Sequence, residues 1–283
     1  MNEHTELRVE EYSYQKYIWD LLKLAHSHQL TVEIIGHETS EMTGVIYPMH
    51  RLMAHPNSRA NICIVAGIHG NEIAGPLSIL RLLECFLHQF PAEFRYIIYP
   101  VINPSGFDLR QRYDDDGRDL NAIYSATMKS KNYQEVQAFY EDAQKFSPFE
   151  AVLTLHEDSD LEYFYMYGLG KENIQFYHAV CAFAKMMCPA WENAEIYGFT
   201  SDEFGLVHSN ARDHAFDAAL YHQGKAKVAL ALETPGKLDI NFRSNMMAQL
   251  VLHCLHLLSA KNYMEPFCSE HRKKKGNISP IQP

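Results

Sequence analysis

Two residues that can bind a metal ion follow a short apolar run in the N-terminal part of the chain. His69 and Glu72 stand three positions apart, directly after residues 62–66 and Gly67. An imidazole and a carboxylate at one turn supply two of the three protein ligands of a hydrolytic zinc site, whose fourth position stays open for water. An isolated pair of this kind is more often a surface histidine beside a glutamate that starts a helix. The remainder of the chain therefore decides between the two interpretations.

The residues on either side of this pair predict a strand that is followed at once by a helix. Residues 62–66 form a continuous apolar run, which is typical of a buried strand. Apolar residues then recur at helical spacing, so we expect a helix from about 73 to 89. His69 and Glu72 would thus lie on a loop at the carboxyl end of a strand, where α/β proteins place their chemistry.

Two more apolar runs end in residues that could take part in the same site. Residues 151–155 lead directly to His156, and residues 228–232 lead directly to Glu233. The carboxyl ends of parallel strands lie along one edge of a sheet, so both side chains are expected beside the first pair. Two histidines and one glutamate form a known hydrolytic zinc set, and this leaves Glu233 free to act as a general base.

A fourth apolar run, residues 94–102, precedes a polar loop. This loop carries two arginines and one asparagine that could reach the same edge, namely Arg110, Arg112 and Asn121. We expect a long ordered loop over residues 107–130, because long irregular segments in a compact domain are usually functional.

The order of strands and helices predicts an α/β fold. We expect a single domain with a twisted, mostly parallel mixed sheet and helices on both faces. Residues 31–35 and 43–47 are expected to form an antiparallel edge pair, and residues 195–215 a mixed loop. The domain is predicted to span residues 1–265, followed by a solvated tail at 266–283.

Composition excludes several classes of partner. The 35 acidic and 25 basic residues give a formal charge of −10, which argues against binding nucleic acid or an anionic membrane surface. The first residues have no basic and apolar leader pattern, so we expect no signal peptide. No apolar stretch reaches the roughly 18 residues of a membrane span. The six cysteines show no paired spacing, which favours reduced thiols and a cytoplasmic location.

Taken together, these motifs resemble the zinc carboxypeptidase family and its aspartoacylase and succinylglutamate desuccinylase relatives. The resemblance covers residues 60 to 240. It rests on five short segments in a specific order: His-Gly-Asn-Glu at 69–72, Asn-Pro-Ser-Gly at 103–106, Asp-Leu-Asn at 119–121, His156, and Leu-Glu-Thr-Pro at 232–235. It implies the α/β sheet fold of that family and one Zn²⁺ per chain.

The resemblance also implies roles for individual residues. The zinc ligands would be His69, Glu72 and His156. Glu233 would be the base that takes a proton from the attacking water and passes it to the leaving amine. Arg112 would stabilise the oxyanion, with the neighbouring Arg110 as the alternative. Asn121 would contact the terminal carboxylate of the substrate.

The sequence departs from the family pattern at one position. Ala122 stands where the family usually has an arginine that grips the terminal carboxylate. The cations that could replace it are Arg118, Arg212, Lys237 and Arg243. Either Tyr197 or Tyr221 could correspond to the mobile tyrosine of the family.

The acidic residues after His156 could also select the substrate. Asp158, or alternatively Asp160, would favour a substrate that carries a cationic group. The leading hypothesis is a metallocarboxypeptidase-like hydrolase that cleaves an amide bond in small peptides. The alternatives are an N-acyl-amino-acid amidohydrolase of the aspartoacylase type and an inactive protein that binds zinc without turnover.

Overall fold

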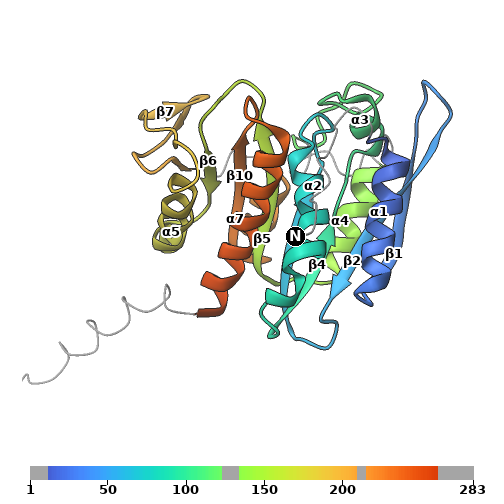
Figure 1. Ribbon diagram of the computed structural model, residues 1–283, viewed down its shortest axis with the longest axis horizontal. Helices are drawn as coiled ribbons and strands as arrows, with labels where there is room; N and C mark the ends of the chain where they lie inside the picture. Colours follow the sequence, from blue (N-terminus) through green and yellow to red (C-terminus); the bar gives the residue numbers. More distant parts are fainter. Residues whose placement is uncertain (1–11, 123–133, 209–214, 261–283) are drawn as a thin grey trace, which may run out of the picture.

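Eight strands form one mixed sheet in the order β1-β2-β4-β3-β5-β10-β6-β9 (Figure 1). The structure is a computed structural model that describes residues 12–122, 134–208 and 215–260. The strands span Thr31–Thr39 (β1), Ile46–Ala54 (β2), Ala60–Ala66 (β3), Phe94–Tyr99 (β4), Phe149–Asp158 (β5), Tyr165–Gly168 (β6), Leu206–His208 (β9) and Ala226–Pro235 (β10). A separate hairpin pairs β7 (Glu195–Ile196) with β8 (Phe199–Thr200).

The centre of the sheet is parallel and its margins are mixed. Strands β4, β3, β5 and β10 run in one direction. Strands β1 and β2 form an antiparallel pair on one side, while β6 runs antiparallel to β10 on the other. The prediction of a single α/β domain with a mostly parallel mixed sheet is therefore confirmed. The carboxyl ends of the four central strands meet at one edge of the sheet.

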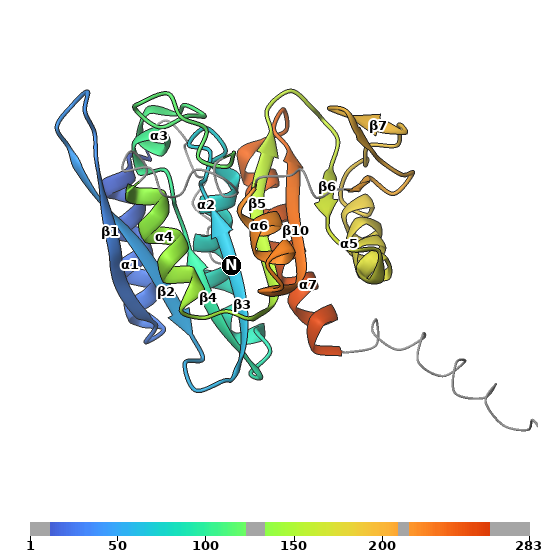
Figure 2. The same ribbon diagram turned by 180° about the vertical axis from the view of Figure 1, so that it is seen from behind.

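Helices cover both faces of the sheet, as predicted. Helices α1 (Tyr14–Ser27), α2 (Ala74–Arg81), α5 (Ile174–Lys185) and α7 (Ile240–Ala260) lie on one face (Figure 1). Helices α4 (Gln134–Gln144) and α6 (Phe216–His222) lie on the other (Figure 2). Strand β3 is buried on both sides: Ile62 and Ile64 pack in the first core, and Cys63 and Val65 pack in the second. This double burial explains why the strand reads as an unbroken apolar run.

Sequence patterning also accounts for the helix boundaries. Helix α1 begins after Ser13, whose side chain accepts a hydrogen bond from the backbone N–H of Lys16. Its buried residues Tyr17, Leu21 and Ala25 recur every four positions along one stripe. Helix α2 continues as a π-helical turn at Leu82–Phe86 and a 3₁₀ turn at Leu87–Gln89, so the predicted helix at 73–89 changes type along its length. No described helix meets the length and apolarity that crossing a membrane requires.

Several local predictions are wrong. The first strand extends to Thr39 rather than ending at 35, because Gly36 lies inside β1 at an irregularity in the pairing and does not end that strand. The second strand spans Ile46–Ala54 rather than 43–47. Residues 104–109 form a short helix, α3 (Pro104–Leu109), instead of opening the loop. The region expected as a mixed loop contains β7, β8 and β9. Residues 123–133 of the predicted loop and the predicted tail lie outside the described residues.

Candidate metal centre

The loop between β3 and α2 places His69 and Glu72 by packing closely against the start of α3. The backbone oxygen of Gly67 accepts hydrogen bonds from the N–H groups of Ile102 (3.1 Å) and Asn103 (2.8 Å). A Cβ atom at Gly70 would lie 1.9 Å from the carbonyl carbon of Gly106. Only glycine fits at position 70, and this contact fixes the loop that carries both candidate ligands.

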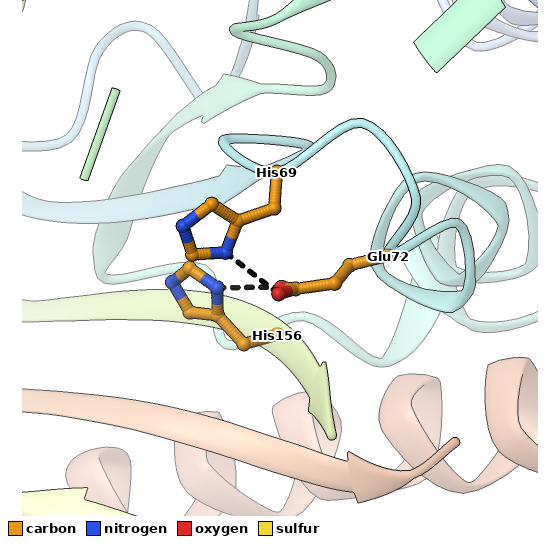
Figure 3. Close-up of side chains that lie close together, drawn as sticks. All are labelled: His69, Glu72 and His156. Atoms are coloured by element: carbon orange, nitrogen blue, oxygen red, sulfur yellow. Dashed lines mark hydrogen bonds and ion pairs between the residues drawn. The ribbon is translucent and has the colours of Figure 1, made fainter. Parts of the chain in front are cut away.

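Three side chains converge at the carboxyl ends of neighbouring strands (Figure 3). His69 follows β3, His156 lies near the end of β5, and these two strands pair in parallel. The Nδ1 atom of His69 lies 2.6 Å from Oε1 of Glu72, and Nδ1 of His156 lies 2.7 Å from Oε2 of the same carboxylate. One ligand atom from each residue lies within 4.8 Å of the others, and all three residues are buried.

The second ring nitrogen of His69 has an acidic partner that sequence reasoning missed. Its Nε2 atom lies 3.1 Å from Oδ1 of Asp119. A carboxylate at this position favours the tautomer with the proton on Nε2, which leaves the lone pair of Nδ1 available to a metal ion. The signal was present in the Asp-Leu-Asn motif, because histidine ligands usually donate their other N–H to a carboxylate.

The electrostatics of this cluster suit a bound cation. Burial lowers the pKa of His69, but the charge of Glu72 and the hydrogen bonds of Asp119 and Glu72 outweigh it and raise the pKa to about 9. Burial raises the pKa of Glu72, and the two histidines reverse this effect and hold it well below its ordinary value. A site that stabilises a proton between Nδ1 and a carboxylate offers the same negative potential to a metal ion. Two imidazoles and one carboxylate are a donor set that fits Zn²⁺.

The Asp119→Asn variant should bind zinc about 10- to 100-fold more weakly than the wild type, because the neutral amide no longer fixes the tautomer of His69. Competition with a chelator of known zinc affinity measures the change. Asp20→Asn is the matched control, since Asp20 pairs with Lys16 on the surface of α1. Equal zinc affinities for the Asp119→Asn variant and the control would show that Asp119 does not support His69.

Arg112 joins the cluster from the loop after α3. Its Nη1 atom donates to Oε1 of Glu72 at 3.2 Å, and its Nη2 atom donates to Oδ2 of Asp119 at 3.3 Å. The side chain is 44% exposed, so its outer edge remains accessible to a ligand. Burial lowers the pKa of Arg112, but Glu72 and Asp119 outweigh this effect and raise it.

Glu233 lies beside the cluster without belonging to it. It pairs with His156 in the parallel register of β10 and β5, and with Tyr165 across β6. Its pKa is raised well above the ordinary value by burial and by the nearby charges of Glu72 and Asp158, against a smaller opposite effect of Arg112. A carboxylate with a raised pKa holds a proton more readily than an ordinary glutamate does, which suits a general base.

These residues surround a cavity of about 490 Å³. Seven of the residues predicted from sequence line it: His69, Glu72, Arg112, Asn121, His156, Asp158 and Glu233. Arg110 is the exception, because its guanidinium donates to the backbone oxygens of Phe107 and Tyr12 and lies over the Phe107 ring. The structure therefore places Arg110 against α1 and α3, away from the cavity.

Four cations were proposed to replace the missing arginine. None of the three that the structure describes lines the cavity. Arg118 pairs with two aspartates of its own loop, and Arg243 pairs with Glu157. Lys237 is exposed on the surface, and Arg212 lies outside the described residues. Of the two candidate tyrosines, Tyr197 lines the cavity, whereas the hydroxyl of Tyr221 donates to Glu172.

Glu157 secures the loop of the metal ligands. Its Oε1 atom accepts the backbone N–H of Ala74 at 2.7 Å, at the start of α2, while its Oε2 atom pairs with Arg243 of α7. Its own backbone N–H donates to Oε2 of Glu72 at 3.3 Å. Burial raises the pKa of Glu157 to about 7 in spite of the opposing charge of Arg243.

Replacing Arg243 by Ala should lower the free energy of unfolding by roughly 3–5 kcal/mol, because it leaves the buried Glu157 carboxylate without its cation. Chemical denaturation of the wild type and the variant measures the loss. The double variant Arg243→Ala/Glu157→Gln serves as the control and should recover part of the stability, since a neutral amide is less costly to bury. A loss below about 1 kcal/mol in Arg243→Ala, the level of a surface pair, would contradict this account.

Comparison with known proteins agrees with the fold. The sequence model of the succinylglutamate desuccinylase/aspartoacylase catalytic domain matches residues 58–227, which is more than half of the chain. This match includes His69, Glu72 and His156 and ends before Glu233. A search of curated proteins gives no match.

Solved structures show the same architecture at low sequence identity. A candidate metallopeptidase from Shewanella amazonensis SB2B is 20% identical with a TM-score of 0.74, over 86% of this chain and 92% of that chain. A metallo-carboxypeptidase from Burkholderia cenocepacia is 16% identical with a TM-score of 0.69, over 88% and 70%. One from Pseudomonas aeruginosa, solved with (2-guanidinoethylmercapto)succinic acid, is 14% identical with a TM-score of 0.66, over 88% and 69%. These likenesses confirm the predicted carboxypeptidase-like fold.

Proposed function

Because this chain belongs to the succinylglutamate desuccinylase/aspartoacylase catalytic domain family, we propose that it is a zinc-dependent hydrolase that cleaves an amide bond in small peptides. One observation carries the proposal. Two histidines and a glutamate converge within 4.8 Å at the edge of a cavity that Glu233 also lines, in a family of hydrolases. Glu233 is half-buried and is not one of the three ligand residues, and a hydrolase needs a carboxylate at such a place as a base.

The proposed mechanism assigns one task to each residue. Zinc held by His69, Glu72 and His156 would supply a Lewis acid that polarises the scissile carbonyl and lowers the pKa of water. Glu233 takes the proton of the attacking water on its carboxylate and returns it to the leaving amine. Arg112 donates hydrogen bonds to the carbonyl oxygen as this oxygen becomes negative, which typically contributes a factor of about 10² to 10³ in rate.

The second candidate is an N-acyl-amino-acid amidohydrolase of the aspartoacylase type. The family match favours it, since the matching catalytic domain is that of succinylglutamate desuccinylase and aspartoacylase. Ala122 removes the arginine that would hold a terminal carboxylate, and this weakens both candidates equally. Asn121 lines the cavity and is the proposed contact for that carboxylate in either case.

A panel of di- and tripeptides and N-acyl amino acids distinguishes the candidates. The protein should be stripped of metal, reloaded with one equivalent of zinc, and assayed for amine release. We expect release by the zinc-loaded protein, its loss on stripping, and its return with zinc. The substrate set that is cleaved selects between peptides and acyl amino acids. Zinc binding without any amine release would instead support a binding protein that has lost turnover.

Two broader expectations belong to the same proposal. The catalytic domain would span residues 1–265, with a tail at 266–283. A cytoplasmic location is supported by the cysteines of the described residues, which are free thiols: Cys63, Cys85, Cys181, Cys188 and Cys254.

A further inference from the structure

One part of the cavity lining has no role in the chemistry proposed above. It combines the Asp158 carboxylate with four aromatic side chains, which we call the aromatic wall: Tyr165, Tyr167, Tyr197 and Phe199. We propose that Asp158 and the aromatic wall bind a cationic group of the substrate, so that the enzyme selects substrates with an ammonium or guanidinium side chain. This inference rests on the proposed function and names its substrate class.

The side chain of Asp158 is buried and has no cationic partner among the described residues. It is only 8% exposed. Its Oδ2 atom accepts the hydroxyls of Tyr165 (2.9 Å) and Tyr197 (2.8 Å), and its Oδ1 atom accepts the backbone N–H of Asp160 (2.9 Å). These three donors are neutral, and no lysine or arginine of the described residues forms an ion pair with Asp158. Burying a charge without a counter-ion is costly, and a cation from the substrate would supply one.

The aromatic wall independently favours a cation. The rings of Tyr165 and Tyr167 stand edge to face at 5.7 Å between centroids, and those of Tyr167 and Phe199 do so at 5.6 Å. Tyr167 and Phe199 are half-buried, which leaves part of their ring surface to the cavity. The face of an aromatic ring attracts an ammonium or guanidinium group, by about 0.5–2 kcal/mol per contact.

The cavity as a whole offers negative charge and acceptors. Among the described residues that line it, Arg112 is the sole lysine or arginine, against six carboxylates: Glu72, Glu157, Asp158, Asp160, Asp217 and Glu233. Of these, Glu157 is already paired with Arg243 of α7. With a divalent metal ion bound, the ionised side chains of the lining would still have a net negative charge. The Oδ1 atoms of Asn71 and Asn121 are also buried, and neither has a hydrogen-bond partner within the part of the chain that the structure describes. These oxygens can accept N–H groups, whereas an anionic substrate side chain would be repelled.

The proposed cation site lies next to the reaction centre. Asp158 follows the ligand His156 by two positions on β5, so the two side chains project from the same face of the strand. Their Cα atoms are separated by roughly 7 Å along an extended strand. Tyr165 pairs with Glu233 across β6 and β10. A cation held here would therefore belong to the residue beside the cleaved bond.

Four matched substrates test this inference. They carry lysine, Nε-acetyl-lysine or glutamate beside the cleaved amide, and arginine replaces lysine in a fourth to separate ammonium from guanidinium binding. For the zinc-loaded wild type we expect kcat/KM to be about 10- to 100-fold higher with lysine than with acetyl-lysine. Asp158→Asn should bring the two within about threefold, mainly by lowering activity on lysine. The control Glu203→Gln, at an exposed position, should keep the preference.

A second variant and a binding measurement separate the failure of the cation site from the failure of the proposed activity. Tyr167→Leu removes one ring without changing charge, and it should weaken the lysine preference several-fold. Equilibrium binding of the same compounds to zinc-loaded Glu233→Gln protein gives the preference without turnover. If no compound is cleaved but lysine still binds about tenfold more tightly, the proposed activity fails and the cation site stands. Equal cleavage and binding of lysine and acetyl-lysine, or a preference for glutamate, would overturn the cation site even in an active hydrolase.

Discussion

Glu233→Gln should bind zinc as the wild type does and lose nearly all turnover, with kcat lower by about 10²- to 10⁴-fold. The reason is that Glu233 lines the cavity beside the three candidate ligands but forms no part of the 4.8 Å cluster. An amide in its place has nearly the same shape and cannot accept a proton. The measurement is kcat on a substrate that the zinc-loaded wild type cleaves, together with the zinc content of both proteins.

The control for this prediction is Glu84→Gln, at an exposed position on the helix that follows the metal loop. It should retain both zinc and activity. Wild-type turnover by Glu233→Gln would rule out its role as the base. Loss of zinc in Glu233→Gln would mean instead that this carboxylate is a ligand, or that it holds one in place.

His156→Ala should lose zinc, because it leaves only two protein ligands. Removal of a residue that merely orients a ligand already lowers metal affinity by about 10- to 100-fold, so loss of a ligand itself should exceed 100-fold. The alanine also removes the partner of Oε2 of Glu72, which frees that side chain to move. Metal analysis after dialysis against a weak chelator gives the zinc content per chain.

His88→Ala, at an exposed position, is the matched control and should keep one zinc per chain. Circular dichroism of both variants separates loss of metal from loss of fold. One full zinc equivalent in folded His156→Ala protein would contradict the ligand set and would move the metal to another group of side chains.

The central sheet and the meeting of the candidate ligands at one sheet edge could be predicted from sequence for one physical reason. Parallel strands that are buried on both faces appear in the sequence as unbroken apolar runs. The residue after each run therefore lies at the carboxyl end of a strand. Strands β3, β5 and β10 show this pattern, and they place His69, His156 and Glu233 on one sheet edge. The general shape of the site thus follows from local patterns and a topological rule.

The short elements could not be predicted in this way. Strands β6 to β9 contain two to four residues each, too few for a periodic pattern, and their pairing is set by distant partners. The start of α3 does carry a local signal: Asn103 caps the helix by accepting the N–H of Gly106, and Pro104 occupies the first turn.

Contacts between distant side chains also lie beyond sequence patterning. The backbone of Arg110 determines which of the two loop arginines reaches the cavity. Arg110 has a left-handed conformation (φ 56°) that ends α3, and its side chain lies over Phe107. Arg112, two residues later, contacts Glu72 and Asp119. In the same way, no local pattern indicates that Tyr197 donates to Asp158, since that contact joins residues 39 positions apart.

Anomalous diffraction from crystals of the zinc-loaded protein tests the central claim most directly. Data collected on both sides of the zinc absorption edge locate the metal without reference to any assumed ligand. We predict one strong peak per chain, in contact with Nδ1 of His69, Nδ1 of His156 and the carboxylate of Glu72. A fully loaded crystal whose only zinc peak lies elsewhere, with His69 and His156 contacting Glu72 alone, would contradict the account.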